Sequence, residues 1–69
     1  MDEVIKLIYS SIDFTNELYK TNDVDIMNKI NNFIKVSKKL GIYIKLDENE
    51  NKYILEYFNV EIYKKHINN

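Results

Sequence analysis

Several residue types are missing from this 69-residue chain, and their absence excludes whole classes of site. Without cysteine there is no disulfide framework, so a disulfide-stapled secreted mini-protein is excluded. Without arginine, the bidentate contact that most often reads guanine is excluded. A single glycine, Gly41, cannot form the glycine-rich loop that cradles phosphate groups.

The chain also has little net charge and no long apolar run. The net charge is −1, so no global field draws the chain to nucleic acid or to an anionic membrane. No apolar run approaches the ~20 residues that span a bilayer, and the chain opens with the acidic MDEVIK, unlike a signal peptide. We therefore expect no membrane association and a cytoplasmic location.

The residues that are abundant suggest an origin. Ala, Gln, Pro and Trp are absent alongside Cys and Arg, whereas Ile, Lys, Asn and Tyr are used heavily. The favoured residues have codons rich in A and T. This bias indicates an AT-rich genome, or a phage or mobile element within one, in which case the location would be the host cytoplasm.

Two helices are predicted at the start of the chain, over residues 2–20 and 23–40, with a short polar connection between them. In the second helix, Asn22 or Asp23 can cap the first free amides, and Gly41 can turn left-handed to close it. The first helix is apolar over an arc of about 220°, whereas one packed face needs only ~100°. We expect an antiparallel pair whose first helix is covered from two directions, by the rest of the chain or by a second copy.

After Gly41 the apolar residues alternate, which predicts strands at 42–46 and 52–58 around a polar turn. A four-residue loop would place three pairs on the core side: Leu46 with Tyr53, Ile44 with Leu55, and Ile42 with Tyr57.

The tail, 59–69, fits two structures. Asn59 as an N-cap, followed by apolar residues at helical spacing, favours a short helix, whereas the alternation of Val60 and Ile62 would serve a third strand. We prefer the helix. The predicted fold is a single α+β domain over residues 1–69, with two antiparallel helices packed on a β-hairpin and a short C-terminal helix or third strand.

Groups able to carry chemistry do not assemble in the sequence. His66 is the only histidine, and no serine or second ligand is placed to work with it. The turn at 47–51 begins like a calcium-binding EF-hand loop, but Lys52 stands where that loop needs glycine and Phe58 where it needs glutamate. We therefore expect no catalytic residue, metal or cofactor, and no enzymatic activity.

A small dimeric nucleic-acid-binding regulator is the alternative function. The order helix, helix, hairpin is that of a winged-helix module, and abundant tyrosine can stack on bases. A wing usually offers cations to phosphate, however, and this hairpin tip carries Asp47, Glu48 and Glu50. The lysines of the second helix match a solvated face. Nucleic acid is therefore not the expected partner.

The outer face of the hairpin is the predicted interface. In the register above, Tyr43, Ile54 and Phe58 point away from the helices, a contiguous aromatic and apolar patch beside the acidic tip. Self-cover of this patch by the tail is the open alternative. The predicted interface comprises Tyr43, Ile54, Glu56, Phe58, Asp47, Glu48 and Glu50.

The expected function is a small non-enzymatic protein-binding module, of the phage or mobile-element inhibitor type, that occupies the surface of another protein. A homodimer formed through the first helix, 2–20, is a further possibility that the sequence leaves open.

Overall fold

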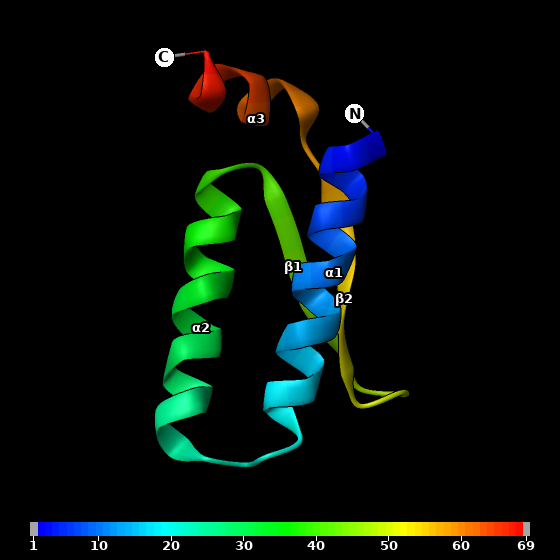
Figure 1. Ribbon diagram of the computed structural model, residues 1–69, viewed down its shortest axis with the longest axis vertical. Coiled ribbons are helices and arrows are strands. Elements are labelled where there is room, and N and C mark those ends of the chain that lie inside the picture. The colour runs from blue at the N-terminus through cyan, green and yellow to red at the C-terminus, as the bar shows by residue number, and fades with distance from the viewer. Residues whose placement is uncertain (1, 69) are drawn as a thin grey trace.

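The computed structural model describes residues 2–68 and has the α+β arrangement expected from the sequence. Two helices, an antiparallel hairpin and a short C-terminal helix follow one another along the chain (Figure 1). Their bounds are α1 Asp2–Tyr19, α2 Val24–Lys39, β1 Ile42–Asp47, β2 Lys52–Phe58 and α3 Val60–Ile67.

Capping residues set the ends of α2. The Asp23 carboxylate accepts hydrogen bonds from the amides of Asp25 (2.8 Å) and Ile26 (3.4 Å), which have no partner within the helix. At the other end Gly41 has φ +83°, the left-handed conformation that stops a helix. The helix therefore runs one residue shorter at each end than the predicted 23–40, because Asp23 and Leu40 are its caps.

The hairpin turns through the four residues between Asp47 and Lys52, as the predicted loop length required. The Asp47 side chain accepts from the Asn49 amide at 3.0 Å, and Asn51 adopts a left-handed φ of 53°. Two of the expected pairs are observed, Leu46 with Tyr53 and Ile44 with Leu55, although Leu46, expected on the core side, is exposed.

The third expected pair is wrong. A register shift between Tyr43 and Ile44 leaves Glu56 as an extra residue in β2, a β-bulge, so that Tyr43 pairs with Tyr57 and Ile42 with Phe58. Because a slip of one residue exchanges the two faces of a strand, Phe58 turns inward and Tyr57 outward. Phe58 packs against the core and against Tyr63, whose ring centroid is 5.3 Å away.

The tail forms a helix, α3, and not a third strand. Asn59 is its N-cap and accepts from the Ile62 amide at 3.1 Å. The Asn59 amide donates to the Gly41 carbonyl at 2.7 Å, which joins the start of α3 to the end of α2. A Cβ atom at Gly41 would lie 2.6 Å from the Asn59 carbonyl oxygen, so only glycine permits this approach.

The core lies where the first four elements meet. α1 packs along β2 and α2 along β1, and α3 crosses the end of the molecule near the start of α1 (Figure 1). The most buried apolar residues come from all four of those elements: Ile8, Ile12, Ile30, Ile44 and Tyr53.

Candidate protein-interaction surface

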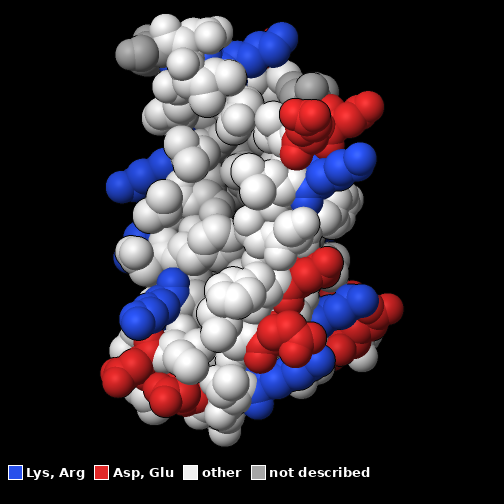
Figure 2. All heavy atoms as spheres, in the orientation of Figure 1, with Lys and Arg blue, Asp and Glu red and all other residues white. Residues whose placement is uncertain are grey.

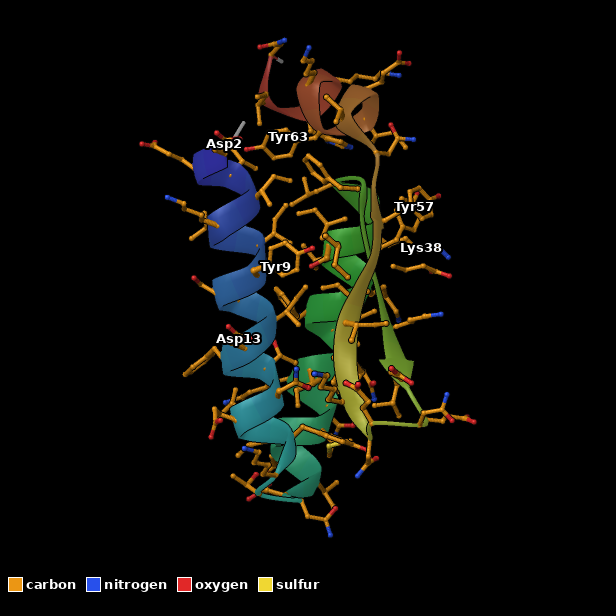
Figure 3. All side chains as sticks on the ribbon, turned by 90° about the vertical axis from the view of Figure 1, so that its right-hand side faces the viewer. Asp2, Tyr9, Asp13, Lys38, Tyr57 and Tyr63 are labelled. Carbon is orange, nitrogen blue, oxygen red and sulfur yellow. The ribbon has the colours of Figure 1, made fainter. Side chains whose placement is uncertain are left out.

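The outer face of the hairpin carries a tyrosine pair. The rings of Tyr43 and Tyr57 stack with centroids 4.2 Å apart and planes 7° from parallel, and Tyr57 points away from α1 (Figure 3). A hydrogen bond with the Tyr43 hydroxyl raises the pKa of Tyr57, because it stabilises the neutral phenol. Ile54 shares this face, half-buried opposite Lys45. Phe58, predicted here, lies on the other side of the strand.

The charged residues of the predicted interface have local partners at the hairpin tip. The Glu50 carboxylate pairs with Lys52 Nζ at 2.8 Å and raises the pKa of that ammonium group. Asp47 is engaged by the Asn49 amide, while Glu48 and the bulge residue Glu56 are exposed. Within residues 2–68 no three His, Asp or Glu side chains gather to hold a metal ion.

A different surface, the groove between α1 and α2, is hollow and apolar. Its wider part encloses about 460 Å³, with Leu18, Ile30 and Phe33 among its lining residues. Phe14 stands at its border with 65% of its surface exposed. Exposed aromatic surface beside an apolar hollow is a recurring feature of protein-binding sites.

The hollow continues toward α3. A second cavity of about 210 Å³ shares Phe33 and Ser11 with the first, so the two form one trough, named here the α1–α2 groove. Leu7 borders this end and is 69% exposed. Tyr63, on α3, closes its upper limit and points toward the space between α1 and the hairpin (Figure 3).

The groove stays open because α1 is held elsewhere. The Asn16 side chain accepts from the Tyr53 amide at 2.6 Å and donates to the Tyr53 carbonyl at 2.9 Å, using backbone groups of β2 that β1 leaves free. Tyr19 packs edge-on against the Tyr53 ring at 5.1 Å, and burial there raises the pKa of Tyr53. These contacts fix α1 along β2, and α1 touches α2 less extensively.

Two hydroxyl groups inside the groove already have backbone partners. The Ser11 hydroxyl donates to the Leu7 carbonyl at 2.9 Å, and the Thr15 hydroxyl donates to the Ser11 carbonyl at 2.8 Å. Within residues 2–68, no buried side-chain nitrogen or oxygen lacks a hydrogen-bond partner. A partner could therefore cover the groove without stranding these hydroxyls.

Charge borders the groove differently on its two sides. Figure 2 shows an uncharged strip along the middle of this face. Lysines lie on the left over α2, with carboxylates at its lower end, and carboxylates interleaved with lysines lie on the right. α1 contains four carboxylates and one lysine, whereas α2 contains one carboxylate and four lysines. The groove thus separates an acidic helix from a basic one.

Sequence reasoning placed the interface on the hairpin and missed two features. Tyr57 was assigned to the core, because no glycine marks the bulge that turns it outward. The groove did leave a signal, the wide apolar arc of the first helix. Leu7, Tyr9 and Phe14 of that arc stay exposed, and Leu7 and Phe14 are the two that border the groove. His66 lies exposed in α3.

Comparison with family models, with curated proteins and with solved structures finds no match to this chain in any of the three. Among the described residues, no helix combines the length and the apolar composition needed to cross a bilayer.

Proposed function

We propose that this chain is a non-enzymatic protein-binding module that takes its partner into the α1–α2 groove. It acts by occupying a surface, as an inhibitor or an assembly subunit does, and it turns over no substrate. The observation that carries the proposal is the pair Leu7 and Phe14, each about two-thirds exposed beside a hollow lined by apolar side chains.

Energetics favour this surface over the outer hairpin face. Removing apolar surface from water contributes about 25 cal/mol per Å² to binding. A partner that covers the exposed Phe14 and Leu7 side chains would therefore gain binding free energy. On the hairpin, Tyr43 and Tyr57 already cover part of each other by stacking, and Phe58 is turned inward. Less apolar surface therefore remains there for a partner.

Site-specific photocrosslinking tests the proposal. A benzophenone amino acid replaces Phe14 in one variant and Tyr57 in another, which is an exposed aromatic on the opposite face and so a matched control. Each variant is irradiated as purified chain and in cell lysate, with excess unmodified chain as competitor. We expect competable crosslinks to protein from position 14 and few from position 57.

The control variant also tests the interface predicted from the sequence. Competable crosslinks from position 57 alone would return the binding site to the hairpin and contradict the groove. Crosslinks from neither position would contradict a protein-binding role for both faces.

A further inference from the structure

We propose that the partner of the α1–α2 groove is a second copy of this chain, related by a two-fold axis that runs parallel to the helices. This inference rests on the proposed function, since it names the occupant of that groove. The arrangement would set α1 of each subunit against α2 of the other, forming a four-helix layer between the two hairpins.

The mirrored charges of α1 and α2 point to a second copy. A partner that suits this face needs a basic side opposite α1 and an acidic side opposite α2. Another copy has both, because over their whole lengths α1 carries four carboxylates to one lysine and α2 one carboxylate to four lysines, although Lys38 points to the hairpin side (Figure 3). Within residues 2–68 the two ion pairs join Lys20 to Glu17 and Lys52 to Glu50, so neither links α1 to α2 in the monomer.

The charges also select the axis. In a face-to-face dimer, a two-fold axis across the helices places α1 on the partner's α1 and α2 on the partner's α2, which brings like charges together. An axis along the helices places each acidic helix on a basic one. Only the second choice makes the contact electrostatically complementary.

Under this rotation, side chains of the two subunits that face each other lie at the same level along the groove. An axis parallel to the helices leaves each residue at its own level along the groove. Phe14 and Lys29 line the same part of the groove, and Leu7 lies near the level of Ser37. Phe14 would therefore enter the partner subunit's groove beside Phe33, and Leu7 would meet the partner subunit's Val36, which is 47% exposed.

An ion pair follows from the same matching. Glu17 precedes Leu18, which lines the groove together with Lys29. The rotation brings Glu17 to the level of the partner subunit's Lys29, on the facing helix. Each dimer contains this contact twice, once on either side of the axis.

The available area suits a stable dimer. A standard interface buries about 800 Å² on each partner, roughly 15% of the 5368 Å² accessible surface of this chain. The whole molecule measures 36 × 21 × 18 Å, and the groove lies on the broad side that Figure 1 shows, which is of the required size. A domain of 69 residues also has a small core of its own, and a shared one would stabilise both copies.

Sedimentation equilibrium of the full chain, over a range of concentrations, is the first measurement. We expect a monomer–dimer equilibrium whose dissociation constant rises at least about tenfold in Phe14→Ser. Tyr57→Ser likewise replaces an exposed aromatic ring by serine, on the far face, and should leave the constant unchanged. Circular dichroism checks that each variant is folded, and Leu7→Ser serves if Phe14→Ser is not.

Charge reversal tests the axis. Glu17→Lys and Lys29→Glu each place like charges in both copies of the contact and should each weaken self-association at least about tenfold. Mixing the two variants pairs lysine with glutamate at both contacts and should restore a dimer, which is a heterodimer. The double variant should restore a homodimer.

Each outcome decides something. A chain that stays monomeric at millimolar concentration overturns the second copy as partner, while crosslinks from position 14 to another protein would still support the groove. A dimer that survives Phe14→Ser and Leu7→Ser overturns this interface. A dimer that both variants disrupt, but whose charge reversals are not rescued by mixing, overturns the axis.

Discussion

Helix α1 meets its two neighbours in different ways. Against β2 it forms a closed contact, in which Asn16 bonds to the backbone of Tyr53 and Tyr19 packs on the Tyr53 ring. Against α2 it leaves a groove, with Leu7 and Phe14 exposed at the border. Directional bonds on one side hold the helix in place, so that apolar side chains on the other side are free to meet a partner.

Trimming one aliphatic side chain on each side of α1 should show the largest contrast. Ile12 is 4% exposed and contributes to the α1–β2 contact, so Ile12→Ala should lower the free energy of unfolding by about 2–5 kcal/mol. Leu7→Ala should change it by less than about 0.5 kcal/mol in the monomer, because Leu7 is already largely solvated. Urea denaturation at low micromolar concentration measures both values, and equal losses would contradict the difference between the two sides.

Removing the Asn16 amide should have an intermediate effect. Asn16→Ala leaves the N–H and C=O of Tyr53 without these partners in a part-buried contact, so we expect a loss of about 1–3 kcal/mol. Asn31→Ala is the matched control, since Asn31 lies exposed on α2 and alanine favours a helix. It should be neutral or slightly stabilising.

Hydrogen exchange localises the same change. The Tyr53 amide should exchange faster in Asn16→Ala, while amides in the middle of α2 keep their protection relative to global unfolding. Unchanged protection at Tyr53 would show that Asn16 does not hold α1 to β2.

The titration of two tyrosines should show the smallest effect. Burial raises the pKa of Tyr53, whereas the hydrogen bond with Tyr43 is the first cause of the raised pKa of Tyr57. Tyr43→Phe should therefore lower the pKa of Tyr57 toward its ordinary value of about 10 and leave Tyr53 unaffected. NMR of the ring carbons as a function of pH resolves the two residues.

The sign of the linked stability follows from the raised pKa. Tyr57 favours the folded state while both phenols are neutral, which holds below the ordinary pKa of about 10. That contribution disappears as the pH rises through the higher folded-state value. Tyr43→Phe should weaken this alkaline loss of stability, and an unchanged profile would show that the tyrosine pair does not contribute to it.

Local signals in the sequence were sufficient for the elements and their caps. As helix caps, Asp23 and Asn59 act through side-chain oxygens within three residues of their own positions, and Gly41 ends α2 through its own left-handed φ. These capping roles depend little on the rest of the fold. The four-residue turn is local in the same sense. These features account for the agreement in element order and, to within a residue at most ends, in bounds.

Long-range packing decided what sequence reasoning missed. The bulge at Glu56 places Phe58 against Tyr63, a ring on α3. The alternation of apolar residues along β2 does not predict that contact. The groove depends on the spacing between α1 and α2, which is set partly by Asn16 and Tyr53, 37 positions apart in the chain. The wide apolar arc of α1 indicated surplus apolar surface without locating it.

Gly41 has a consequence for how this chain can evolve. Any side chain at this position would strain a φ of +83° and press on the Asn59 carbonyl oxygen, 2.6 Å from the new atom. Removing that steric clash would require α3 to move away from the strands. Phe58 would then lose its contact with Tyr63 and become exposed apolar surface at this end of the molecule. Related sequences in which α3 keeps this position must therefore keep glycine here, whereas exposed positions such as Asn31 tolerate substitution.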